Sequence, residues 1–120
     1  MSWFRPWTIS AALWTLTVAW LMVLPSTSVD AAVSGWPILL EIPSLDKLIH
    51  VGSFGLVAWL WMRALAEHGI QASDRAIWLL PLLGTIAFGV VMEGVQSFLP
   101  TRSAQWADML ANSLGALVAV

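Results

Sequence analysis

The segment Glu93–Asn112, EGVQSFLPTRSAQWADMLAN, sets acids, amides and an arginine between two apolar runs of the chain. Glu93 and Gln96 are three residues apart, which puts them on one face of a predicted helix. Asp108 and Asn112 are four residues apart, with the same effect on the next predicted helix. This polar segment is the place where we expect a specific function.

The composition is typical of an integral membrane protein. Of 120 residues, 59% are hydrophobic, 10% are charged and nine are Trp, and the mean hydropathy is +0.82. The formal charge is -2 without a basic tract, so we expect no nucleic-acid partner. The absence of Cys excludes disulfides, thiolate metal sites and thiol nucleophiles.

Four apolar runs predict an all-α membrane protein, a bundle of four transmembrane helices in a single domain spanning residues 1–120. About 20 helical residues cross a hydrocarbon core of about 30 Å. The fourth run is short, about 22 Å as a helix. The predicted helices cover about 7–24, 46–66, 77–99 and 106–120.

A cleavable signal peptide is an alternative for the first run. Val29, Asp30 and Ala31 loosely resemble a small-residue cleavage site after a hydrophobic core. However, the apolar run at 7–24 exceeds the roughly 7 to 15 residues usual for such a core. A membrane span is therefore the preferred interpretation.

In any chain with four membrane spans, three helix ends lie on one side of the membrane. They are the start of the second helix, the end of the third and the start of the fourth. Polar residues gather at these three ends, so we expect them to converge on one pocket. Independent structural roles, such as favourable charges in first helical turns or hydrogen bonds between helices, are the alternative. The predicted site consists of Asp46, Lys47, His50, Glu93, Gln96, Arg102, Asp108 and Asn112.

Glu93 lies six residues before Leu99, about 9 Å inside the predicted helix end. An acid at depth costs roughly 2.5 to 3.5 kcal/mol on insertion scales, so we expect it to be paired or protonated. Three acids and two bases in the predicted site leave one negative charge, which one proton on His50 or one bound cation would neutralise.

The distribution of basic residues predicts an orientation of the chain in its membrane. With the N-terminus cytoplasmic, Arg5, Arg63 and Arg75 lie inside, while Lys47 and Arg102 lie outside. The predicted pocket then faces the extracytoplasmic side.

The acids and the histidine are also ligand types for hard or borderline cations. Sequence separation alone cannot place them around one ion, and P-loop and dinucleotide motifs are absent. We therefore assign no metal and no cofactor. The set considered as an alternative metal site is Asp46, His50, Glu93 and Asp108.

Three sequence blocks, DKxxH from Asp46, ExxQxxxPxR from Glu93 and DxxxNxxG from Asp108, resemble the successive signatures of the VanZ-like family of small bacterial membrane proteins. The resemblance covers roughly Asp46 to Gly115 and departs from the family pattern at 103–107 (SAQWA). It implies a cell-envelope protein, since the family's namesake is associated with low-level resistance to the glycopeptide teicoplanin.

Three function classes follow. In the first, membrane lipids surround a pocket that recognises a lipid-linked or peptidoglycan-related headgroup, with Arg102 and Lys47 suited to an anionic group. In the second, an acid and His50 transfer protons on such a substrate, so His50→Ala would abolish turnover. In the third, the protein is a structural or assembly partner, and the cluster only locks its helices together. The sequence leaves the oligomeric state open.

Overall fold

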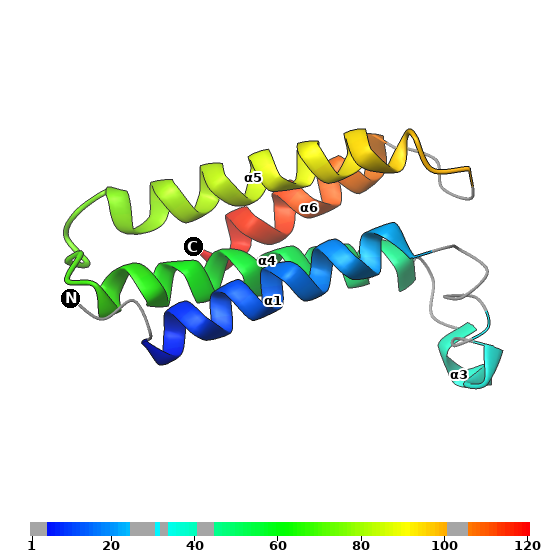
Figure 1. Ribbon diagram of the computed structural model, residues 1–120, viewed down its shortest axis with the longest axis horizontal. Helices are drawn as coiled ribbons and strands as arrows, with labels where there is room; N and C mark the ends of the chain where they lie inside the picture. The colour runs from blue at the N-terminus through cyan, green and yellow to red at the C-terminus, as the bar shows by residue number, and fades with distance from the viewer. Residues whose placement is uncertain (1–4, 25–30, 32–33, 41–44, 101–105) are drawn as a thin grey trace.

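The computed structural model describes residues 5–24, 31, 34–40, 45–100 and 106–120. Helices α1, α4, α5 and α6 run alongside one another, and the short α3 lies beyond one end of them (Figure 1). The predicted all-α bundle of four helices is confirmed. The helices are α1 (Pro6–Val23), α3 (Pro37–Leu40), α4 (Leu45–Glu67), α5 (Ala76–Gln96) and α6 (Trp106–Ala119).

The number of candidate membrane spans in the described residues is three rather than the expected four. Helices α1, α4 and α5, with 18, 23 and 21 residues, are long and apolar enough to cross a membrane. Helix α6 has 14 residues, about 21 Å, which is less than the roughly 30 Å of a hydrocarbon core. Helix length therefore corrects the expected number of spans.

The turn from α4 to α5 is built by a glycine and an aspartate. Gly69 has a φ of 92°, the left-handed conformation that glycine adopts without steric cost. The Ile70 N–H then donates to the Leu65 carbonyl at 3.1 Å, which caps the end of α4. Asp74 Oδ1 accepts from the Ala76 N–H at 2.9 Å. These caps reverse the chain, so α5 returns along α4.

Helix α5 ends at Gln96, three residues before the predicted end. The Phe98 and Leu99 N–H groups bond to carbonyls three residues back, both at 3.1 Å, which is the tighter spacing common where a helix stops. Pro100 disfavours a helical conformation for the residue before it. Glu93 is therefore only about 4.5 Å from the helix end, nearer to it than the predicted 9 Å or so.

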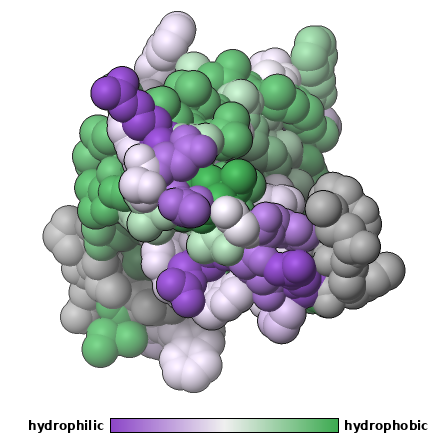
Figure 2. Space-filling model, turned by 90° about the vertical axis from the view of Figure 1, so that its left-hand side faces the viewer, coloured by the Kyte–Doolittle hydropathy of each residue, from purple (hydrophilic) through white to green (hydrophobic). Residues whose placement is uncertain are grey.

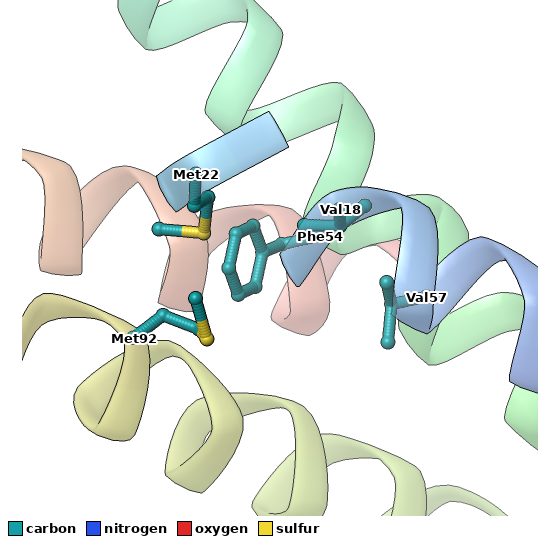
Figure 3. Close-up of a cluster of buried hydrophobic side chains, with 5 residues drawn as sticks. All are labelled: Val18, Met22, Phe54, Val57 and Met92. Carbon is teal, nitrogen blue, oxygen red and sulfur yellow. The ribbon is translucent and has the colours of Figure 1, made fainter. Parts of the chain in front are cut away.

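Helix α4 is the centre of the bundle, since its packing against α1, α5 and α6 is more extensive than that of any other described helix. Its Phe54 is buried, with Met22 of α1 and Met92 of α5 beside the ring (Figure 3). Thioether sulfur packs favourably against aromatic rings. The cluster holds three helices together beside the predicted site, and it consists of Val18, Met22, Phe54, Val57 and Met92.

Candidate functional site

The structure places the start of α4, the end of α5 and the start of α6 at the same end of the bundle, together with the end of α1 (Figure 1). Arg102 lies outside the described residues. The other seven predicted residues lie at this end: Asp46, Lys47, His50, Glu93, Gln96, Asp108 and Asn112.

An ion pair joins α4 to α6 at this end. Lys47 Nζ binds Asp108 Oδ1 and also lies 3.0 Å from Asp46 Oδ2. The ammonium group therefore has a carboxylate from its own helix and one from α6. Asp108 is buried, whereas the Asp46 side chain is 67% exposed. The contact with Asp108 is thus the better shielded of the two.

A hydrogen bond one turn deeper joins the same two helices. His50 Nδ1–H donates to Asn112 Oδ1 at 2.7 Å, because an amide oxygen can only accept. In the neutral ring, Nε2 is then the acceptor, and it lies 3.9 Å from Asp108 Oδ2. Asn112 is 1% exposed. The pair therefore sets the tautomer and the orientation of the imidazole.

The two polar residues of α5 are both buried. Gln96 Nε2 donates to the Met22 carbonyl at 2.8 Å, which ties the end of α5 to the end of α1. Glu93 is 2% exposed, so its carboxyl group lies inside the bundle rather than against lipid. Glu93 lies one turn after Gly89, and Gly89 packs against Phe54 and Asn112.

A cavity of about 290 Å³ lies between α1, α4 and α5 beside these groups. One part of its wall is polar and the rest is apolar. Three predicted residues, Asp46, His50 and Gln96, line it. Its other lining residues are Val18, Leu21, Met22, Ile49, Ser53 and Phe54.

The structure therefore divides the predicted site into two parts. Lys47, Asp108 and Asn112 fasten α4 to α6 and do not line the cavity. Glu93 is buried in the bundle and does not line the cavity either. His50 belongs to both parts, since Nδ1 is bonded to Asn112 while the ring lines the cavity.

Sequence reasoning missed the contribution of α1. Its last turns supply Val18, Leu21 and Met22 to the cavity, and the Met22 carbonyl accepts the bond from Gln96. These side chains are apolar, so no polar pattern marks them. The signal lay in the topology, because the end of a first span is on the same side as the start of the second.

The alternative of a metal site gains no support from the geometry. Among the described residues, no group of three or more His, Asp or Glu side chains is arranged to hold a metal ion. At the α4–α6 contact, the Lys47 ammonium already lies against the carboxylates of Asp46 and Asp108. The described chemistry is that of hydrogen bonds and ion pairs.

Comparison with known proteins defines the family. No curated protein and no solved structure matches the chain. The family model for VanZ/LLP1 matches residues 3–120. This match extends well beyond the segment from Asp46 to Gly115 that carries the three sequence blocks. The chain therefore belongs to the VanZ/LLP1 family.

Proposed function

We propose that this protein binds a lipid-linked or peptidoglycan-related molecule of the bacterial cell envelope in the cavity between α1, α4 and α5. The observation that carries the proposal is the mixed wall of that cavity. Asp46, His50 and Gln96 supply polar groups, while residues such as Leu21 and Phe54 supply apolar surface. A ligand with a polar headgroup and a hydrocarbon part matches both surfaces.

The polar wall favours hydroxyl, amide or amino groups on the ligand. The Asp46 carboxylate and the Gln96 amide oxygen accept hydrogen bonds, as does His50 Nε2 in the neutral ring. Lys47 has its charge compensated by Asp46 and Asp108, so it is less suited to an anionic group than the sequence implied. The sugar and peptide parts of envelope precursors offer such donors. Of the two basic residues of the predicted site, Arg102 is then the one proposed to bind an anionic part.

The direction in which the cavity faces rests on the basic residues at the other end. Three arginines stand against two acids there, and Figure 2 shows hydrophilic side chains gathered on that end between hydrophobic flanks. Basic residues favour the cytoplasmic side, which supports a cytoplasmic N-terminus in the bacterial cytoplasmic membrane and an extracytoplasmic cavity. These residues are Arg5, Arg63 and Arg75, with Glu67 and Asp74.

The resemblance to the family's namesake extends the proposal to a phenotype. Binding of an envelope precursor on the extracytoplasmic side of the cytoplasmic membrane would link the protein to low-level teicoplanin resistance. Expression of the chain in a susceptible bacterial strain is expected to raise the inhibitory concentration of teicoplanin. Asp46→Asn is expected to reduce that increase.

A structural role is the second candidate, and specific contacts favour it. The Lys47–Asp108 and His50–Asn112 pairs join α4 to α6 and need no ligand. In this alternative, the cavity binds nothing selectively, and variants of the polar residues change only stability. The two candidates therefore differ in what the cavity-lining residues do.

Lipid binding by the purified protein separates these candidates. The protein in mild detergent is titrated with a lipid-linked peptidoglycan precursor and, separately, with phosphatidylglycerol, and bound lipid is counted by native mass spectrometry. We expect the precursor to bind preferentially, and Asp46→Asn and Arg102→Ala to weaken it. Asp74→Asn is the matched control, because Asp74 is exposed at the opposite end.

Equal binding of both lipids, or equal binding by Asp46→Asn and the wild type, would leave only the structural role. The same samples test for catalysis, since conversion of the precursor that disappears in His50→Ala would show an enzyme. Binding without conversion would establish a recognition protein.

A further inference from the structure

A second cavity, of about 630 Å³, lies at the opposite end of the bundle between α4, α5 and α6. Its wall is largely apolar, formed by residues such as Met62, Trp78, Leu82 and Leu117. Among the described residues that line it, Arg63 is the one with a charged side chain. We propose that an anionic phospholipid binds here, with its phosphate on Arg63 and an acyl chain in the cavity. This site is separate from the one of the proposed function.

The charge of Arg63 is oriented but not neutralised by its described neighbours. Its guanidinium carbon lies 4.8 Å from the ring centroid of Trp7 and 6.0 Å from that of Trp59. No ion pair of Arg63 occurs in the described part of the chain. Indole rings attract the cation and leave its N–H donors in a fixed position. A phosphate could accept two of these donors at once.

The acid nearest to Arg63 along the helix is engaged elsewhere. Glu67 lies one turn after Arg63, and its Oε2 accepts from the Thr8 N–H at 3.3 Å and from the Thr8 hydroxyl at 3.4 Å. These bonds hold the carboxylate toward α1. The exposed guanidinium is therefore available for an anion from outside the described chain.

The surroundings place the cavity mouth at the level of lipid headgroups. Trp78 lines the cavity and is exposed, and Trp59, one turn before Arg63, is exposed too. Tryptophan concentrates at the membrane interface. The end carries more arginines than acids and shows a hydrophilic surface (Figure 2). Basic pockets between membrane helices bind anionic lipid headgroups, and the apolar wall below Arg63 matches an acyl chain. A zwitterionic lipid gains less, because its own cation compensates the phosphate.

The test compares lipid binding by full-length charge variants. Native mass spectrometry measures binding of phosphatidylglycerol and of phosphatidylcholine with identical acyl chains. We expect the wild type to prefer phosphatidylglycerol by about fivefold, the factor that corresponds to about 1 kcal/mol per basic residue. Arg63→Gln should abolish the preference and Arg63→Lys should keep most of it. Arg75→Gln removes the same charge at the same end but does not line the cavity, so its preference should remain.

A variant that fills the cavity tests the acyl chain. Ala66 lines the cavity and is exposed, so Ala66→Leu should weaken both lipids without removing charge. Inorganic phosphate should not displace phosphatidylglycerol, because it lacks the chain. Retained preference in Arg63→Gln, equal loss in Arg75→Gln, unchanged binding in Ala66→Leu, or full competition by phosphate would each overturn the proposal. If Arg63→Gln fails to fold, Arg63→Met takes its place, because it removes the same charge but keeps a long side chain, and a retained preference in Arg63→Met would equally overturn the proposal.

Discussion

Gly115 of α6 lies directly against the backbone carbonyl of Val51 of α4, with no space for a methyl group between them. A Cβ atom at position 115 would lie 2.9 Å from the Val51 carbonyl carbon and 3.0 Å from its Cα. Small residues allow membrane helices to approach this closely. The approach brings Lys47 and His50 within reach of their partners on α6.

Gly115→Ala is expected to destabilise the protein by about 1 to 3 kcal/mol, because the added methyl group overpacks the α4–α6 contact and the opposing atoms are backbone. Denaturant unfolding in detergent measures the change. Gly94→Ala is the control, since a Cβ there meets no atom within 4 Å. Equal stability of the two variants would contradict the close approach.

The Lys47–Asp108 pair is expected to contribute to the association of α4 and α6. Both side chains are partly shielded from solvent, so we expect a coupling energy of roughly 0.5 to 3 kcal/mol from a double-mutant cycle with Lys47→Met and Asp108→Asn. The cycle of Lys47→Met with Asp46→Asn is the comparison, and its coupling should be at most about 1 kcal/mol because Asp46 is exposed. Strictly additive effects at Lys47 and Asp108 would rule out the predicted coupling.

Thr85→Val is expected to stabilise the protein by about 1 kcal/mol. Thr85 is 2% exposed, and its hydroxyl has no hydrogen-bond partner among the described residues. Replacing an unsatisfied buried hydroxyl by a methyl group removes a desolvation cost. Thermal unfolding of the purified protein measures the effect.

Thr15→Val provides the opposite control. The Thr15 hydroxyl donates to the Ala11 carbonyl at 2.8 Å and accepts from Trp61 Nε1 at 3.0 Å. Removing the hydroxyl leaves the partly buried indole N–H of Trp61 without its acceptor, so this variant should be destabilised. A lower melting temperature for Thr85→Val than for the wild type would show that its hydroxyl is satisfied.

Gln96→Leu is expected to loosen the end of α1, because it removes the donor to the Met22 carbonyl. Hydrogen bonds between membrane helices contribute about 0.6 kcal/mol on average and up to about 1.7 kcal/mol. Hydrogen exchange of the α1 amides measures the local effect. Gln71→Leu, at an exposed position in the α4–α5 turn, should leave this exchange unchanged. If both variants exchange like the wild type, the contact does not restrain α1.

Part of the candidate site could be predicted because it depends on helix periodicity and on topology. The spacing of His50 from Asp46, and of Asn112 from Asp108, places side chains on one helix face without knowledge of any partner. The partners themselves are distant in sequence, since Lys47 and Asp108 are 61 positions apart. Their pairing depends on how α4 and α6 are rotated and how closely they approach, and local sequence encodes neither.

The amino-acid sequence by itself determined an apolar helical bundle of the VanZ-like type, because long hydrophobic runs and three ordered polar blocks are local properties of the chain. The tertiary structure alone decided that α5 ends at Gln96 rather than three residues later. It also decided that Lys47 fastens helices while Asp46 and His50 line a cavity with the apolar end of α1. These distinctions come from helix ends, rotation and close packing, which arise only when segments far apart in sequence meet.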